Sequence, residues 1–529
     1  MYQLLLFIIG DFLNKLAFKK VFCSLPMFKK SHSGVKTMME VNYTDIVIVG
    51  AGASGIAAAL TAIEKGCRVV LLEKGDKFGG AGMFGAQGLF AVNSQQQKAK
   101  NINYTVSDAF HELLEYTHYR SNAKITKKIL NKSAETIEWL ASNGLETELV
   151  NNTQEPHQKH AEVYHQYIDK YNGFQRLMDN FVSQGGILLT ETSGLSIIKD
   201  NTDQISGIRI SHKGIPSTIN CKAVICADGG FIGNQEMVAK YSAIDPDVLH
   251  SMGERKATGD GIKMLEQIGG DTRHIGVFEN HAATVTSPIN SKWHQNSLFT
   301  LTNVPLLWID KHATRFVNEE IVYDFALWGN ATYAASGYYY IIIDQALISH
   351  LEKQQLNWTD AFERTFKTLS HEPISHKIGP FPTLRNDLTD AVKNKAAWTA
   401  KTLDELAIQL TLDPNKLNAA IKQYNKSVEH KKDTLFYKNS KFLSFKVEQG
   451  PFYALKARST SLGTIGGIET NENMEVLDQK GNIIKRAYAT GNNASGMYDT
   501  SYPTLEGISC AFAWNSGRIA GAAAVEALN

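Results

Sequence analysis

The chain has 529 residues and a mass of 58.5 kDa, which is more than one hydrophobic core usually holds and predicts two or more domains. Hydrophobic residues make up 43% and charged residues 20%, values that exclude a disordered chain. The 54 Lys and Arg residues balance 53 Asp and Glu residues, and the net charge of +1 excludes the basic surface by which proteins attract nucleic acid.

Residues 1–43 differ from the rest of the chain. The apolar run Leu4–Ile9 is far shorter than the roughly 20 residues that span a bilayer, and neither a preceding charge nor a cleavage pattern indicates a signal peptide. Residues 1–30 can be interpreted as an amphipathic helix that contacts a membrane surface. We favour a poorly ordered extension, with Met38 or Met39 as alternative starts.

A nucleotide-binding pattern begins at residue 44. The apolar run Ile46–Val49 predicts a buried strand, and Gly50, Gly52 and Gly55 follow it in G-x-G-x-x-G spacing. These glycines allow a tight turn, a close approach of the backbone to a pyrophosphate, and packing of helix on strand. The alanine-rich segment 56–65 predicts the helix whose N-terminus faces the phosphates.

The next segments identify the nucleotide more closely. A second strand is predicted at Val69–Leu72, and Glu73 at its end can accept hydrogen bonds from both ribose hydroxyls of an adenosine. The glycine-rich loop 79–88 then brings further backbone N–H groups near a bound cofactor, which favours FAD over NAD.

The C-terminal region shows a related pattern. Residues 487–493 predict a strand that ends in a glycine turn, and a helix is predicted to begin near Gly507. That helix N-terminus is suited to stabilise negative charge on a reduced flavin, although an ordinary closing strand and helix would give the same pattern. Between these regions, residues 281–300 are predicted to be loop, and 402–427 are predicted to form two helices broken at Pro414.

Several motifs occur in one order along residues 44–529: GAGASG, LLEKGDKFGG, AVICADGGF, ATGDGIKML, RFVNE, LGTIGGI and ATGNNASGMY. In this the chain resembles the flavoprotein family that includes fumarate reductase, succinate dehydrogenase, urocanate reductase and 3-ketosteroid dehydrogenases. The resemblance implies an α/β fold with a Rossmann-like FAD-binding domain at 44–275 plus 463–529. A mobile α+β capping domain would be inserted at 276–462.

The resemblance also implies non-covalent FAD and the residues that bind it. They lie in the two glycine-rich turns, at the ends of predicted strands and at the start of the last helix. The implied contacts are Gly50, Gly52, Ala53, Ser54, Gly55, Glu73, Lys74, Gly79, Gly80, Ala81, Gly82, Gln87, Gly88, Gly194, Asp260, Gly463, Asn492, Ser509 and Cys510.

The chain departs from the fumarate reductase pattern at substrate-binding positions. Tyr323 stands where the family has a proton-donating arginine, Leu462 replaces a histidine, and Thr504 replaces an arginine that holds a carboxylate. A buried carboxylate needs paired donors, so fumarate is predicted to bind poorly. His281 does match an active-site histidine of the family.

Tyrosines occupy positions that resemble those of 3-ketosteroid dehydrogenases. Tyr323 and Tyr502 match tyrosines that polarise a ketone and move protons there, although Glu506 stands where those enzymes have glycine. A phenol can donate a proton to a carbanion or a hydrogen bond to a carbonyl. Each tyrosine can also be interpreted as an ordinary packing residue.

The predicted function is therefore FAD-dependent oxidoreduction of a CH–CH bond. The preferred direction is reduction of the C=C bond of an enoate or enone, with hydride from flavin N5, a proton from Tyr323, and Tyr502 and His281 orienting the substrate. The alternatives are a ketosteroid-type dehydrogenase, a true fumarate reductase, and an electron carrier without catalysis. Because no CxxCH haem motif occurs, electrons are expected to come from an external donor.

Cysteines and histidines give no metal-binding pattern. The five cysteines are scattered, which argues against a disulfide framework and fits a reducing compartment, so the cytoplasm is expected. His157, His160 and His165 have spacings found in metal sites, but without matching ligands a solvated loop or helix face is the preferred interpretation.

Overall fold

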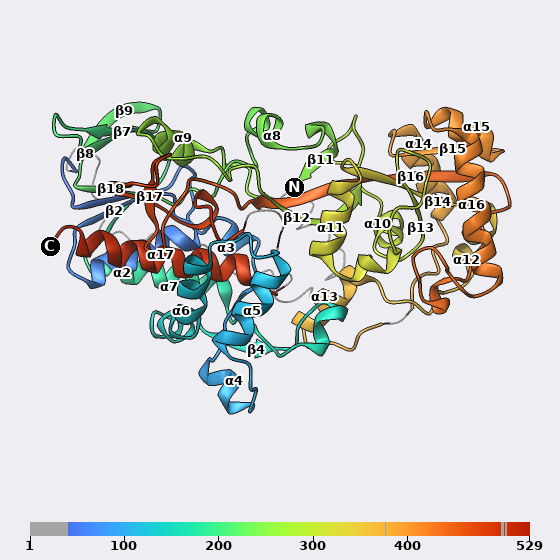
Figure 1. Ribbon diagram of the computed structural model, residues 1–529, viewed down its shortest axis with the longest axis horizontal. Helices are drawn as coiled ribbons and strands as arrows, with labels where there is room; N and C mark the ends of the chain where they lie inside the picture. The colour runs from blue at the N-terminus through green and yellow to red at the C-terminus, as the bar shows by residue number, and fades with distance from the viewer. Residues whose placement is uncertain (1–40, 376, 499–501, 503–504) are drawn as a thin grey trace, which may run out of the picture.

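The structure is a computed structural model that describes residues 41–375, 377–498, 502 and 505–529. The predictions for residues 1–40 lie outside these residues. The molecule is elongated, with blue, green and red elements in one half and yellow and orange elements in the other (Figure 1). Within the described ranges, no helix is both long and apolar enough to cross a membrane.

The first half is built on a six-stranded sheet in the order β17-β18-β10-β1-β2-β6. Its strands are parallel except for β17, which pairs antiparallel with β18. They comprise β1 (Ile46–Val49), β2 (Val69–Leu72), β6 (Ile187–Leu189), β10 (Ala223–Cys226), β17 (Glu475–Leu477) and β18 (Ile483–Ala489). Strands β1, β2 and β10 are buried along their whole length, as their continuous apolar sequences require.

Two helices cover one face of this sheet. They are α2 (Ala53–Glu64) and α17 (Ile508–Glu526), which lie side by side in Figure 1. Their close approach depends on Gly517 and Gly521, because a Cβ at these positions would lie 2.1 Å from the carbonyl oxygen of Ser54 and 2.6 Å from that of Ala58. The predicted strands at 46–49 and 69–72 and the predicted helices are confirmed.

Smaller elements complete the first half. A three-stranded antiparallel sheet packs against the other face of the main sheet, and a second small sheet lies near the start of α17. The strands are β7 (Thr192–Lys199), β8 (Ile205–His212), β9 (Ile215–Asn220), β3 (Gly88–Phe90), β5 (Tyr164–Tyr167) and β4 (Thr147–Val150). The helices are α3 (Gly80–Phe84), α4 (Gln95–Ala99), α5 (Val106–Tyr116), α6 (Ala123–Ser142), α7 (Lys170–Ser183), α8 (Gln235–Tyr241) and α9 (Asp260–Gln267).

The second half is organised around one long strand, β16 (Phe452–Thr464). This strand pairs with β11, β12, β14 and β15, and β13 pairs with β14. The partners are β11 (Leu249–Ser251), β12 (Phe278–Val285), β13 (Leu307–Ile309), β14 (Tyr338–Ile343) and β15 (Ala397–Ala400). The helices are α10 (Asn296–Thr302), α11 (Phe325–Ala334), α12 (Gln345–Lys353), α13 (Ala361–Leu369), α14 (Leu384–Lys393), α15 (Leu403–Gln409) and α16 (Pro414–Glu429).

The hydrophobic cores follow the two halves. One core takes its buried residues from 41–278 and 465–525, and two smaller cores take theirs from 283–457. The chain therefore leaves the first core along β12 and returns to it at the end of β16. The overall fold is α/β, as predicted, and the domain limits at 275 and 462 remain a prediction.

Residues 281–300 are only partly the loop that we predicted, since 286–295 contain no helix or strand but both ends of the range do. Strand β12 continues to Val285, and α10 begins at Asn296. The sequence did not indicate β12 because its pairing with β16 joins residues far apart in the chain. The break at Pro414 is confirmed, since Asp413 caps α16 and Pro414 is its first residue.

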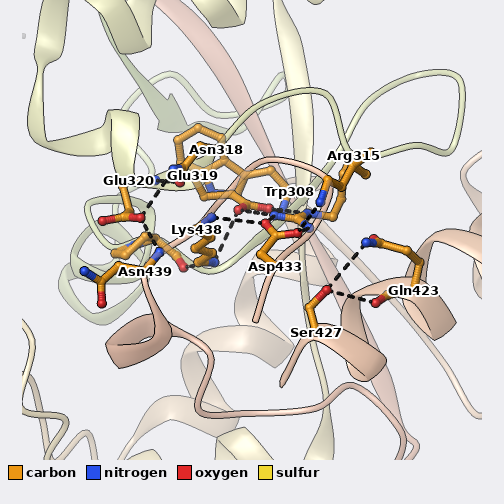
Figure 2. A network of polar contacts seen from close by, with 12 residues as sticks. Trp308, Arg315, Asn318, Glu319, Glu320, Gln423, Ser427, Asp433, Lys438 and Asn439 are labelled. Carbon is orange, nitrogen blue, oxygen red and sulfur yellow. Dashed lines mark hydrogen bonds and ion pairs between the residues drawn. The ribbon is translucent and has the colours of Figure 1, made fainter. Parts of the chain in front are cut away.

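The RFVNE motif forms part of a buried ionic cluster (Figure 2). The guanidinium of Arg315 lies 2.8 Å from Glu319 and 2.9 Å from Asp433, and Lys438 Nζ lies 3.3 Å from Glu319. All four side chains are at most 1% exposed. The cluster ties the segment before α11 to the loop after α16.

Candidate active site

The two glycine-rich turns lie against each other. Gly79 N–H donates to the carbonyl of Ala51 at 2.7 Å, and a Cβ on Gly82 would lie 2.7 Å from that of Ala53. Gly55 packs so close to the first turn that its Cβ would lie 1.8 Å from the carbonyl oxygen of Gly50. The structure therefore brings the predicted positions Gly50, Gly52, Ala53, Ser54, Gly55, Gly79, Gly80, Ala81 and Gly82 together at the start of α2.

The space beside Gly52 is open. A Cβ there would meet no described atom within 4 Å, and Gly52 caps α2 with extended backbone instead of a side chain. The first amides of α2 therefore point out of the helix as donors for an anion. This is the arrangement that a pyrophosphate requires.

Glu73 follows β2, and its carboxylate is fixed by the backbone. One oxygen accepts from Gly75 N–H at 2.7 Å and the other from Ala51 N–H at 3.3 Å, while Lys256 Nζ lies 3.7 Å away. Glu73 is 8% exposed. A carboxylate held in this way at the end of β2 retains acceptor capacity for ribose hydroxyls.

Two further predicted contacts pair with each other. Lys74 Nζ lies 2.8 Å from Asp260, the first residue of α9, and also donates to Thr258. Gly194 lies in β7 against Val49, since its Cβ would be 3.2 Å from a methyl group of that residue. These residues therefore border the same end of the parallel sheet as Glu73.

A second group of predicted residues meets at the junction of the two halves. A Cβ on Gly463 would lie 2.7 Å from Asn492 Nδ2 and 3.2 Å from Glu279 Oε2. Gly491 packs against Ser54, since a Cβ added to Gly491 would lie 2.8 Å from Ser54 Oγ. The hydroxyl of Thr490 is buried and has no partner among the described residues. The open turn at Gly52 and this orphaned hydroxyl lie on neighbouring segments and fit the polar groups of a bound FAD.

The glycine loop continues to a polar group at the start of α17. Lys170 Nζ donates to the carbonyl of Ala86 at 2.8 Å and to Gln87 Oε1 at 3.2 Å. Burial lowers the pKa of Lys170 to about 8. Cys510 Sγ lies 3.0 Å from the hydroxyl of Tyr167, and burial raises the thiol pKa to about 11, so this cysteine stays protonated at neutral pH. Gly88 lies beneath this group in β3, packed against the backbone of His165.

The structure brings His281 and Tyr502 together. Their ring centroids are 6.4 Å apart, and the ring of Phe325 lies 4.9 Å from that of His281. Burial lowers the pKa of His281 to about 4, so the ring is neutral, and its buried Nδ1 has no partner among the described residues. Burial raises the pKa of Tyr502 well above its usual value, and the neighbouring Glu279 raises it further.

Tyr323 lies apart from this pair. Its ring packs in the core of the second half at 5.8 Å from Phe442, and its hydroxyl donates to the carbonyl of Thr359 at 3.0 Å. Leu462, where the family has a histidine, lies near the end of β16. Thr504 lies outside the described residues.

Glu279 is a residue that the sequence analysis missed. Its side chain is 6% exposed, and burial raises its pKa to about 7 against the opposing effect of a hydrogen bond from Ser509. The same serine hydrogen-bonds Tyr502. Glu279 lies in a segment without a motif. The sequence offered one signal, that Glu279 stands two residues before His281, because residues two apart on a strand have side chains on the same face.

His157 and His165 are not solvated, and our interpretation of them was wrong. His157 is 6% exposed and lies between the carboxylates of Asp324 and Glu506, while His165 is fully buried and hydrogen-bonds Ser94. Of these three histidines, His160 alone is exposed. Sequence could not show this because Asp324 and Glu506 are more than 160 residues away from His157.

The fold and these residues define a flavin-dependent oxidoreductase. The sequence matches the family described as FAD binding domain over residues 45–509, and the chain belongs to that family. It is an FAD-dependent oxidoreductase of the fumarate reductase type, which acts on CH–CH bonds.

Known proteins of several kinds are similar to it. The vinyl phenol reductase of Lactiplantibacillus plantarum is 32% identical over 496 residues, which cover 92% of this chain and 97% of that protein. The fumarate reductase (cytochrome) of Shewanella frigidimarina is 26% identical, covering 90% of this chain and 76% of that one. The 3-ketosteroid Δ1-dehydrogenase of Sterolibacterium denitrificans has a TM-score of 0.71 at 18% identity, covering 92% of this chain and all of that one, and shows the fold alone.

Proposed function

We propose that this enzyme reduces the C=C bond of a small aromatic or carbonyl-conjugated substrate that carries at most one carboxylate. The observation that supports this most directly is the neutral, aromatic setting of His281, which faces Phe325 and Tyr502. A dicarboxylate would need charged donors in that place. The relative that acts on a vinyl phenol fits such a substrate.

Each residue of the site has a distinct role in the reduction. Bound FAD supplies hydride chemistry at one carbon of the double bond. Tyr502 is protonated at neutral pH and has a proton to give to the other carbon. His281 is neutral and can accept a hydrogen bond from a substrate hydroxyl or donate one to a carbonyl.

We favour Tyr502 over Tyr323 as the proton donor, although the resemblance points to Tyr323. Tyr502 lies beside His281, whereas Tyr323 would first have to release its hydrogen bond to Thr359. Tyr502 is protonated at neutral pH, whereas the reverse reaction would need it as a tyrosinate base. We place the enzyme in the cytoplasm, since the four described cysteines are free thiols, as in a reducing compartment. We also propose that its electrons come from an external donor.

Anaerobically photoreduced holoenzyme mixed with single acceptors tests this proposal. The acceptors are 4-vinylphenol, an aryl monocarboxylic enoate, a steroid enone and fumarate, and the flavin absorbance is followed. We expect rapid reoxidation by one of the first three while fumarate stays inert. Rapid reoxidation by fumarate would contradict the proposal, as would bleaching of the oxidised flavin by a saturated steroid ketone with no response to any acceptor.

A further inference from the structure

The short segment 153–157 contacts both halves of the molecule. His157 belongs to a 3-10 turn at Glu155–Lys159, Asp324 is the N-cap of α11, and Glu506 precedes α17. His157 Nε2 lies 2.9 Å from Asp324 Oδ2, and Nδ1 lies 3.0 Å from Glu506 Oε1. All three side chains are at most 8% exposed.

Neighbouring hydrogen bonds strengthen the same connection. Glu506 also accepts from the N–H and hydroxyl of Thr153 and from Gln154 N–H, at 2.7 to 2.8 Å. The side-chain oxygen of Gln154 accepts from Phe325 N–H at 2.6 Å. Residues 153–157 therefore contact the first turn of α11 on one side and the turn before α17 on the other.

Both helix starts contribute residues to the proposed active site. Phe325 is the first residue of α11 and contacts His281, and Gly329 packs on the same strand, since its Cβ would lie 2.5 Å from His281 N. Ser509 and Cys510 lie in the first turn of α17. The bridge through His157 thus fixes the position of α11 relative to α17.

Only a protonated ring can complete this bridge. A neutral imidazole has one donor, whereas two ionised carboxylates need two. Burial alone lowers the pKa of His157, but the hydrogen bonds and charges of Asp324 and Glu506 raise it to about 9. The other titratable groups around the ring are His160, 6.2 Å away between ring centroids, and Glu112 and Tyr104, which line the same small pocket.

We propose that His157, as an imidazolium, is a positioning residue that latches α11 to the turn before α17 and so fixes the geometry of the active site. This role rests on the proposed function for its effect on catalysis. The latch itself follows from the contacts alone. It is complete at neutral pH and is lost as pH rises through the range where His157 releases its proton.

The test compares three variants of the holoenzyme. His157→Gln replaces the two donor nitrogens of the ring with one amide nitrogen, which cannot reach both carboxylates. Glu506→Gln removes one carboxylate, and His160→Gln is a matched control at the exposed neighbouring histidine. Amide hydrogen exchange in α11 is measured at pH 7, and kcat and KM are measured from pH 6 to 10 with the best acceptor found.

We expect amides in the first turn of α11 to exchange at least tenfold faster in His157→Gln, and kcat to fall by tenfold or more with less change in KM. In wild type, kcat should decline near pH 9. Glu506→Gln should move that decline to lower pH by about one unit or more, because an amide no longer stabilises the cation. His160→Gln should leave exchange and profile unchanged.

Unchanged exchange in His157→Gln, or a high-pH decline that does not move in Glu506→Gln, would overturn the latch. If His157→Gln does not fold, the pH profile of kcat and the amide exchange of α11 in Glu506→Gln decide whether the latch exists. The exchange measurement needs no substrate. A failed substrate panel with accelerated exchange would therefore reject the proposed function and keep the latch.

Discussion

The buried carboxyl of Glu279 is the clearest source of pH dependence at the scale of single residues. Its folded pKa of about 7 exceeds the usual 4.5, so the folded protein keeps a proton that the unfolded chain releases. The stability it contributes is therefore present at low pH and is lost as pH rises through 7. Denaturant unfolding of the holoenzyme between pH 5 and 8 should show this decline.

Glu279→Gln should remove that part of the pH dependence, because the amide does not titrate. Glu138→Gln, an exposed change on α6, is the matched control and should leave it in place. A decline that persists unchanged in Glu279→Gln would assign the titration to another group.

Substitution by phenylalanine distinguishes the roles of Tyr502 and Tyr323. Tyr502→Phe should retain FAD and lose turnover by about 10²–10⁴-fold, the range for a missing acid–base group. Tyr323→Phe should retain FAD and lose less than about tenfold, because its hydroxyl donates to Thr359 and not toward His281. Flavin absorbance gives occupancy, and steady-state rates give turnover. The opposite ranking would assign the proton to Tyr323.

Sequence predicted the local parts of the site better than the assembled ones. The glycine turn and Glu73 form a continuous motif, so spacing indicated them, and the resemblance to the family indicated the start of α17. The bridge of His157 with Asp324 and Glu506 joins three segments without a shared motif. Only the folded arrangement reveals such a site.

At the scale of elements, the ionic cluster of Arg315 stabilises the second half. Arg315→Met would leave Glu319 and Asp433 buried near one remaining cation, Lys438. Breaking a buried pair in this way costs about 3–5 kcal/mol. Arg385→Met is the control, because Arg385 pairs with Glu352 at the surface, where such pairs contribute about 1 kcal/mol or less.

Denaturant unfolding of both variants measures the difference. A loss for Arg315→Met no larger than that for Arg385→Met would contradict the structural role of the cluster. The elements of this half were also the hardest to predict. Strand β12 is stabilised by pairing with β16, about 180 residues later, whereas α15 and α16 carry their own caps and were recognisable.

At the scale of the whole molecule, cofactor binding should report on the complete fold. The site takes residues from both ends of the described chain, so FAD binds the folded state only. FAD at about 100 times its dissociation constant should add about 2.7 kcal/mol to the free energy of unfolding. Thermal unfolding of FAD-depleted protein with added FAD, and with NAD at the same concentration, checks this. An equal shift with NAD would contradict the specificity for FAD.

The close packing of α17 on α2 has a consequence for how the protein is made. Strand β18 completes the sheet that contains β1, and helix α17 completes the helical layer that contains α2. Strand β1 and helix α2 come more than 400 residues earlier in the chain. A growing chain on the ribosome therefore holds an unfinished nucleotide site, with the glycine turn exposed, until these last elements emerge. Flavin loading is a late event in the biogenesis of this enzyme, and nascent chains halted before β18 should be found without cofactor.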